Sequence, residues 1–428
     1  MPFLGMRGTG DWGPEERPTN YRQGILYLYP NGMAPLTGLL SKMGEERVDD
    51  PQFTWWTKTL AQQSAAVTGI FSNSGLSRPY SGSGKAGDVV FVKIAADKAS
   101  EFKASHQVLL RLSTNLNLDT QSKATAVVIN GASSYLSCTL LEADDNGGSV
   151  NLSSIDTALI SGNINPEGGA MPESVAYDPV KFSNFIQTFR TSLSITRIAR
   201  RTRLRTEDAY KEAKRESLEL HSIEIEKAMF WGIPTENIGA NGKPERTTQG
   251  LIPFIRQHVP GNVSNYTTDP AYAGMDWLTG GETWFDTMLE LVFRFGSMEK
   301  MAFVGSGALL GINKLAKSSG QIFLKSMDMS YGLKVVEWIT PFGTLYLKTH
   351  PLFSFDTATR NAMVIFEPKE LKYRYIDDTH FVEDDGKHGA SRVDGTNEEW
   401  ITDCGMELHF PTKFGFLSGF NQDNKLAA

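Results

Sequence analysis

The stretch RTRLRTEDAYKEAKRESLELHSIEIEKAMFWG, residues 201–232, decides the fold because it joins a basic segment directly to a long charged run. It begins with Arg201, Arg203 and Arg205 and changes at Thr206 to a mostly acidic sequence. A DNA-binding arm, an enzyme's lid and a self-assembling shell subunit could each contain such a junction. The rest of the chain has to discriminate between these classes.

The acidic part predicts a helix over residues 206–232. Thr206 is a suitable N-cap, and Glu207 lies in the first turn, where the helix dipole favours a negative charge. Gly232 and Pro234 supply the stop. At about 1.5 Å per residue the helix is roughly 38 Å long, and its narrow apolar stripe with charged flanks suits a helix that lies across a surface and meets partners on its sides. The stripe consists of Tyr210, Ala213, Ser217, Leu218, His221, Ile225 and Ala228.

The residues before this helix are predicted to form a strand that leads into a basic segment. Phe189, Leu193 and Ile195 alternate with polar residues, as a strand with one apolar face requires. The arginines could contact nucleic acid, but few aromatic residues accompany them for base stacking. We favour a subunit interface in which the basic segment docks on acidic residues of another copy. The interface residues expected here are Arg190, Arg197, Arg200, Arg201, Arg203 and Arg205, with Glu212, Glu216, Glu219 and Glu226 of the helix as the acidic side.

The bulk composition is that of a globular protein with an acidic balance. The chain has 428 residues, of which 40% are hydrophobic and 21% charged, and its formal net charge is -7. This charge argues against a protein that coats nucleic acid by neutralising phosphates. The two cysteines, Cys138 and Cys404, fit a reduced compartment without a disulfide framework. No apolar run has transmembrane length, and the N-terminus lacks the apolar region of a secretory signal.

Residues 1–62 are predicted to be an N-terminal arm, because scattered glycines and prolines prevent a long helix and leave little room for a core. The arm nevertheless contains large apolar side chains, among them Trp55 and Trp56. These must be buried either on the chain's own body or on a neighbouring subunit, and both remain open. In the second case Trp55 and Trp56 belong to the interface.

Residues 63–162 are predicted to be an inserted β-rich module. Asn130-Gly131 is a strong hairpin signal between two strand patterns. Cys138 lies at an apolar position of one alternating strand, which predicts a small core residue rather than a nucleophile. The expected strands are Val89–Ala95, Val108–Ser113, Ala124–Ile129 and Tyr135–Leu141.

The remaining segments alternate helices and strands. Residues 163–205 are expected to be an extended loop, 206–249 a domain built on the long helix, 250–365 a mixed α/β domain, and 366–428 strands that return to the domain of the long helix. Helices are expected at 284–295 and 306–317, and strands at 334–339, 343–349, 362–366, 371–376 and 406–410.

No constellation of residues predicts catalysis, a cofactor or a metal. The segment PYSGSGKAGD, residues 79–88, resembles a phosphate-binding loop but lacks the first glycine and the Ser or Thr after the lysine. The acidic loop 377–389 does not follow the calcium-loop order, so a hydrolase using it is only an alternative. His221 and Glu224 are read as helical surface contacts. Neither H-E-x-x-H nor G-x-S-x-G occurs.

The order of the segments resembles the major capsid protein of tailed double-stranded DNA bacteriophages, a fold that also forms the floor of herpesvirus shells. The resemblance covers nearly the whole chain except the β-rich module. It is carried by PLTGLLSKMGEERVDDPQFTWW (35–56), NPEGGAMPES (165–174), TEDAYKEAKRESLELHSIEIEKAMFWG (206–232), FGTLYLKTHPLF (342–353) and WITDCGMELHFPTKFGFLSGF (400–420).

The resemblance implies an α+β capsid fold with an N-terminal arm, an extended β loop, a peripheral domain with a spine helix, and an axial domain. It also implies self-assembly into pentamers and hexamers of an icosahedral shell around packaged double-stranded DNA, with scaffold, portal and decoration proteins as partners. The expected location is the virion, after synthesis in the cytoplasm of the bacterial host. The inserted module would contact subunits, thicken the shell or receive a decoration protein. Alternatives are a tail or baseplate protein, or a DNA-binding protein using residues 190–205.

Overall fold

The computed structural model describes two compact units, each treated by itself. The body consists of Met1–Trp55 with Lys181–Ala428, and the barrel unit consists of Trp56–Val180. The described residues are 36, 45–58, 63–81, 84–143, 152–169, 171, 174, 176, 179–201, 209–319, 324–328, 334–383 and 395–426.

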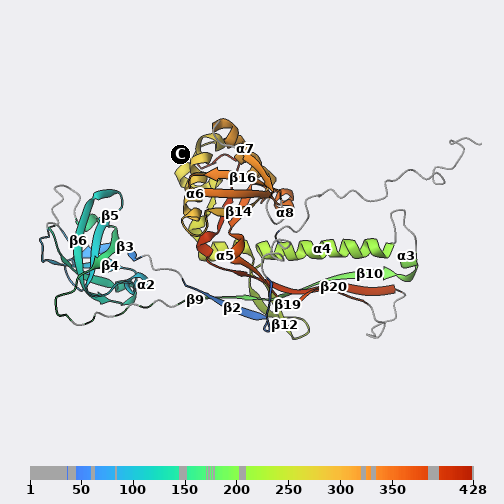
Figure 1. Cartoon of the computed structure of the whole chain (residues 1–428), viewed down its shortest axis with the longest axis horizontal. Coiled ribbons are helices and arrows are strands. Elements are labelled where there is room, and N and C mark those ends of the chain that lie inside the picture. The colour runs from blue at the N-terminus through green and yellow to red at the C-terminus, as the bar shows by residue number, and fades with distance from the viewer. Residues whose placement is uncertain are drawn as a thin grey trace, which may run out of the picture. The chain divides into compact units, whose positions relative to one another are not determined.

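A seven-stranded mixed sheet with the order β13-β21-β18-β14-β17-β16-β15 forms one half of the body (Figure 1). Its central strands are apolar on both faces, as strands covered on two sides must be. Ala302 and Val304 of β14 face one core cluster, whereas Met301 and Phe303 face another. The strands are β13 (Val263–Asn265), β14 (Glu299–Val304), β15 (Leu324–Asp328), β16 (Lys334–Thr340), β17 (Gly343–Thr349), β18 (Ala362–Phe366) and β21 (Gly415–Ser418).

Helices cover both faces of this sheet. The cluster around Trp284 joins α6 and α7 to one face, and the cluster around Phe254 joins α5 to the other. Helix α6 begins at a conventional N-cap, because the Asp276 carboxylate accepts a hydrogen bond from the Thr279 amide at 2.9 Å. The helices are α5 (Leu251–His258), α6 (Trp277–Phe293), α7 (Ser306–Ser319) and α8 (Pro351–Phe355).

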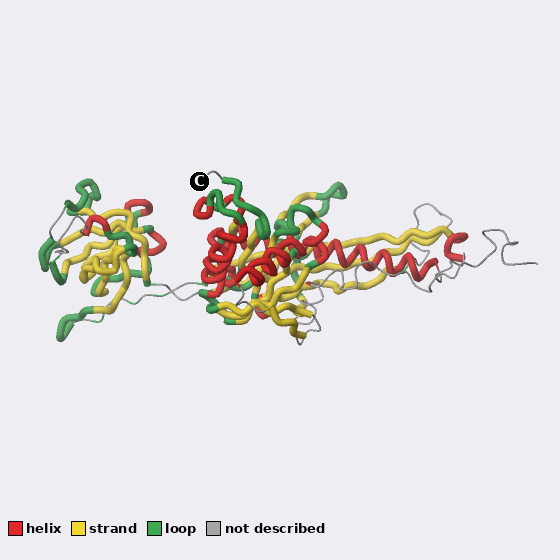
Figure 2. The backbone as a smooth tube through the Cα atoms, turned by 90° about the horizontal axis from the view of Figure 1, so that it is seen from above, coloured by secondary structure: helices red, strands yellow, loops and turns green. Residues whose placement is uncertain are grey.

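A four-stranded sheet with the order β1-β19-β20-β10 forms the other half of the body, and α4 runs along it (Figures 1 and 2). Phe189 and Leu193 of β10 are buried while their neighbours are exposed, which confirms the predicted alternation. The elements are β1 (Glu45–Arg47), β10 (Gln187–Thr196), α3 (Arg197–Arg201), α4 (Ala209–Trp231), β19 (Leu371–Val382) and β20 (Gly395–Leu408).

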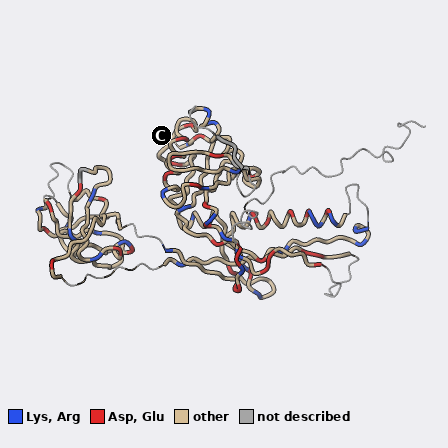
Figure 3. Tube along the Cα trace, in the orientation of Figure 1, with Lys and Arg blue, Asp and Glu red and all other residues tan. Residues whose placement is uncertain are grey.

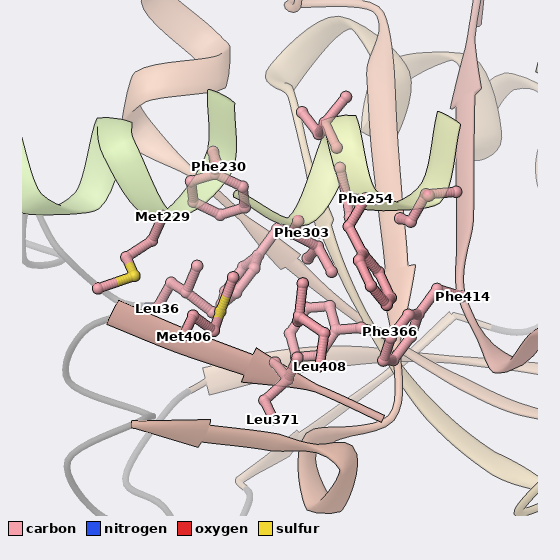
Figure 4. Packing of buried hydrophobic residues seen from close by; sticks show 14 of the residues in the cluster. Leu36, Met229, Phe230, Phe254, Phe303, Phe366, Leu371, Met406, Leu408 and Phe414 are labelled. Atoms are coloured by element: carbon pink, nitrogen blue, oxygen red, sulfur yellow. The ribbon is translucent and has the colours of Figure 1, made fainter. Parts of the chain in front are cut away.

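The two halves of the body share one hydrophobic core. Phe230 at the end of α4, Phe303 of β14 and Met406 of β20 lie in the same buried cluster (Figure 4). Phe230 contacts Phe303 and Phe353 with ring centroids 5.9 and 4.9 Å apart. The C-terminal end of the long helix is therefore part of the core that the two halves share.

Two short ribbons complete the body. The ribbon of β11 and β12 follows α4, and the ribbon of β2 and β9 lies where the chain leaves the body and returns to it. Its two strands pair although more than a hundred residues separate them, so the inserted unit begins and ends at neighbouring points. The strands are β2 (Gln52–Thr57), β9 (Val180–Phe185), β11 (Thr235–Ile238) and β12 (Pro244–Thr247).

The barrel unit is a closed six-stranded barrel with the order β3-β4-β7-β6-β5-β8. Closure removes free strand edges. A hairpin links β6 and β7 as predicted, with Gly131 at φ 50°. The two-residue turn is wrong, because the connection spans residues 129–134 and includes the 3-10 turn Gly131–Ser133. Cys138 is fully buried in the barrel core. The elements are β3 (Ser64–Phe71), β4 (Val89–Ile94), α2 (Ala96–Ala99), β5 (His106–Leu112), β6 (Asn115–Val128), β7 (Tyr135–Leu140) and β8 (Thr157–Asn163).

One predicted boundary is wrong. The last part of the chain was expected to return entirely to the domain of the long helix, but β21 pairs with β18 and β13 in the seven-stranded sheet. The physical reason is apolar composition: Phe416 and Leu417 are buried on opposite faces of that sheet, each in a different core cluster. Residues 415–418 therefore belong with 250–365.

Candidate subunit interface

Three of the predicted interface arginines lie on α3, at the turn between β10 and α4. Arg197, Arg200 and Arg201 are exposed there, and Ile198 between them is 69% exposed. Figure 3 shows this basic end of the body in blue. We call these four residues the α3 cluster. An exposed apolar side chain among cations is a composition that suits a contact surface.

One arginine of the α3 cluster lies against an aromatic ring of α4. The Arg200 guanidinium lies 4.6 Å from the centre of the Tyr210 ring, a cation–π contact. The Tyr210 hydroxyl donates a hydrogen bond to Glu398 at 2.7 Å. Burial, together with this carboxylate, raises the pKa of Tyr210 to about 12, so the hydroxyl stays protonated and can donate to Glu398.

Arg190 lies on β10 rather than on α3, and its charge is paired within the chain. Its Nε donates to Glu399 on the adjacent strand at 2.8 Å, and Glu399 raises the pKa of the guanidinium. Its side chain is still 62% exposed. Arg203 and Arg205 lie outside the described residues.

The acidic residues predicted on α4 divide into two groups. Glu216 is exposed, and Glu212 and Glu219 are half-buried. Glu226 is fully buried and its Oε1 lies 2.8 Å from His350 Nε2. Its assignment to a subunit interface is therefore wrong: it lies in the core of its own chain.

The two tryptophans of the arm also differ. Trp55 is 6% exposed, donates a hydrogen bond through Nε1 to the Leu408 carbonyl at 3.0 Å, and stacks on Phe53 and Phe182. It is a core residue of the body, which corrects its assignment to the interface. Trp56 follows it with the opposite orientation and is 59% exposed.

An ionic network that the sequence did not reveal holds the arm strand β1 to the body. Arg374 of β19 pairs with Glu46 of β1 and with Glu407 of β20. His409 pairs with Glu407 and Glu370, and these hydrogen bonds raise the pKa of His409 to about 9. The polar pair Glu407 and His409, which alternates with apolar residues, is a signal in the sequence, but it is equally typical of a solvated strand face.

His221 is buried rather than at the surface of α4, where it was expected. Its Nδ1 lies 2.9 Å from the Thr191 hydroxyl and its Nε2 2.7 Å from the Thr402 hydroxyl. Burial lowers the pKa of the imidazole. The His221 side chain joins α4 to β10 and β20 through these two hydrogen bonds.

The segments considered for chemistry show no catalytic geometry in their described parts. Residues 377–382 form the end of β19, and in the segment 79–88 the Lys85 amide donates to Asp88 in a tight turn. Over the described residues no group of three or more His, Cys, Asp or Glu side chains is arranged for a metal ion. Nor does any described helix have the length and apolar character needed to cross a membrane.

A family model and a curated relative both indicate a phage major capsid protein. Residues 8–421 match the family model described as SU10 major capsid protein. The chain is 24% identical over 380 residues to the major capsid protein of Pseudomonas phage PaMx41, covering 87% of this chain and 82% of that protein. Among solved structures, a chain of Microbacterium phage Oxtober96 superposes with a TM-score of 0.43 at 11% sequence identity, covering 94% of this chain and 96% of that chain. A chain of Mycobacterium phage Adephagia superposes with a TM-score of 0.41 at 8% identity, covering 93% of this chain and 92% of that chain. Because the family model spans almost the whole sequence, the chain belongs to the SU10 major capsid protein family, a family of phage capsid subunits.

Proposed function

We propose that this capsid protein assembles into pentamers and hexamers of an icosahedral shell around packaged double-stranded DNA, and that the α3 cluster makes one of the contacts between copies. The observation that supports this contact is the position of Arg197, Arg200 and Arg201 together at one exposed end of the body. Arg190 is not included because it lies on β10, away from the α3 helix, and pairs with Glu399.

The partner surface that we propose is α4 of a neighbouring copy. In the described middle of the helix, Glu216 is exposed and Glu219 is half-buried. Charge pairs at the rim of an interface contribute more to register and association rate than to affinity. The α3 cluster is therefore expected to select the geometry of assembly rather than to supply most of its free energy.

The test is charge reversal at two arginines, Arg197→Glu with Arg201→Glu, in the full chain produced with its virion partners. We expect a folded subunit, judged by circular dichroism, that does not form closed shells in electron micrographs or sedimentation velocity. The matched control is Lys243→Glu, an exposed cation near the β11–β12 turn, which should still assemble. Normal shells from the double variant would remove the α3 cluster from the interface.

The barrel unit is proposed to contact neighbouring copies. Leu116 and Ile129 are 64% and 58% exposed on it. Because β2 and β9 pair, the unit can be replaced by a short Gly-Ser link between Lys58 and Pro179. We expect the body to fold without it and the shells to become less stable to heat. Unchanged shells would assign the barrel unit to another task, such as receiving a decoration protein.

Scaffold and portal proteins are further proposed partners, and synthesis in the cytoplasm of a bacterial host is the proposed origin.

A DNA-binding role for the arginines is the competing hypothesis. Fluorescence anisotropy with duplex DNA at two salt concentrations tests it, because binding through phosphates weakens steeply as salt rises. Strong, salt-sensitive binding that Arg197→Glu and Arg201→Glu abolish would favour it over the subunit contact.

A further inference from the structure

We propose that His409 controls how firmly the arm strand β1 is attached to the body: the strand is held while the imidazole carries both protons and is loosened when one of them is lost. The effect passes from His409 to Glu407, from Glu407 to Arg374, and from Arg374 to Glu46 of β1. We call these four residues the ion row. His409 is a positioning residue in this row, and the inference goes beyond shell formation because it concerns how one subunit holds its own arm.

Both ring nitrogens of His409 face a carboxylate. Nε2 is hydrogen-bonded to Glu407 Oε1, and Nδ1 lies 3.6 Å from Glu370 Oε2. A neutral imidazole has one N–H donor and one acceptor nitrogen, whereas the imidazolium has two N–H donors. Only the charged ring can therefore present a proton to both carboxylates at once. Loss of one proton leaves a nitrogen lone pair facing a carboxylate oxygen, so one of these two contacts has to change.

The surroundings of His409 favour the charged ring. Glu407 comes from β20, and Glu370 from the 3-10 turn before β19, where its carbonyl also accepts a hydrogen bond from the His409 amide at 3.0 Å. Lys372 of β19 is the cation that opposes a charge on His409, and the nearby Lys413 is paired with Glu370. The two carboxylates raise the pKa of His409 to about 9, so the ring is charged at neutral pH and loses its charge in a range that can be tested.

Glu407 transmits the charge of His409 to the arm strand. Its side chain is 4% exposed, and its two oxygens have different partners, His409 at Oε1 and Arg374 at Oε2. When His409 becomes neutral, the ion row retains two carboxylates and a single cation. The added negative potential disfavours a second carboxylate beside Arg374. Glu46 is the residue that can leave, because its side chain is 60% exposed and can be solvated by water.

Strand β1 is a short element that can open by itself. It is three residues long, all of them exposed, and it lies at the edge of the four-stranded sheet. Just beyond it, the Val48 amide donates a hydrogen bond to the Tyr375 carbonyl at 2.9 Å. Short, exposed edge segments open at a lower free energy than the core of a domain. The exchange of the Val48 amide therefore reports the detachment of β1.

The experiment is hydrogen–deuterium exchange by mass spectrometry on the unassembled full chain at about pH 6.5 and about pH 10, on either side of the pKa of His409. Rates are corrected for the intrinsic effect of pH. In the wild type we expect the protection of Val48 to fall by about threefold to fivefold at the higher pH, the weight of one partly exposed ion pair. The buried strand β14 is followed in the same samples and should stay protected. In His409→Gln the protection of Val48 should be low at both pH values.

Two variants are matched to this experiment. His409→Arg keeps a permanent charge with donors for both carboxylates, so Val48 should stay protected at both pH values. His380→Gln removes another partly exposed histidine, on β19, and should behave as the wild type.

Three results would overturn the proposal. The first is a protection of Val48 in the wild type that does not change with pH. The second is an equal fall in wild type, His409→Gln and His409→Arg, because another group would then be responsible. The third is an equal loss of protection at Val48 and β14, because the whole body would then open rather than β1 alone.

Discussion

Replacing His409 by glutamine should destabilise the subunit in a manner that depends on pH. Hydrogen bonds with Glu370 and Glu407 raise the pKa of His409 from 6.5 to about 9 in the folded chain. Because the folded value is the higher one, protonation favours folding: the contribution is complete below about pH 6.5 and is lost as pH rises through about 9. At 1.36 kcal/mol per pH unit this amounts to about 3 kcal/mol near pH 6, about 2 kcal/mol near pH 7.5 and almost nothing near pH 10.

Urea unfolding of the unassembled subunit at these three pH values measures this effect, with the free energy of unfolding obtained by linear extrapolation. Lys300, whose pKa burial lowers to about 8, titrates in the same range. It is present in both proteins, so its contribution cancels in the difference between wild type and His409→Gln. A difference that stays the same from about pH 6 to pH 10 would refute the reasoning, because it would show that His409 acts by packing and not by its charge.

Three further outcomes follow from burial and pairing. Phe230→Ala should lower the free energy of unfolding by about 3–5 kcal/mol, since the ring is fully buried; thermal and urea unfolding measure this. Arg190→Ala should lower it by less than about 1 kcal/mol, because the pair with Glu399 is largely exposed on the arginine side; a larger loss in the same assay would contradict this. Cys138 and Cys404 should react with a thiol reagent only after urea is added, because both are buried in the native chain; a rapid reaction without urea would argue against the barrel and body cores described above.

Sequence reasoning succeeded where the signal is local. The alternation around Phe189 placed β10, the helical spacing from Tyr210 onward placed α4, and Asn130-Gly131 placed a barrel hairpin. Each of these patterns lies within one or two adjacent elements, so it predicts the local structure without any knowledge of the tertiary fold. The family was also within reach of the sequence, because the order of segments is a property of the whole chain.

Sequence reasoning failed where a residue's role depends on distant partners. Glu226 lies among the charges of α4 and looks solvated, yet its partners, the Leu36 amide and His350, lie 190 and 124 residues away. Ser217 and His221 of the same helix are buried for a similar reason: Trp400 and Thr402 of β20 supply their hydrogen bonds. The periodicity of a helix therefore does not predict which of its acidic residues is buried by partners that are distant in sequence.

The described part of the arm resolves one alternative that the sequence left open. A three-residue strand such as β1, all of it exposed, is too short to hold its place by ladder hydrogen bonds alone. It is held at Glu46 by Arg374, and the arm is held again at Leu36 by Glu226. Leu36 and Glu46 are thus each held by this chain's own body, and Trp55 packs in the same core. For Leu36 and Trp55 the chain's own body therefore provides the cover that their apolar side chains require, and the contacts that we propose between copies use exposed groups such as the α3 cluster.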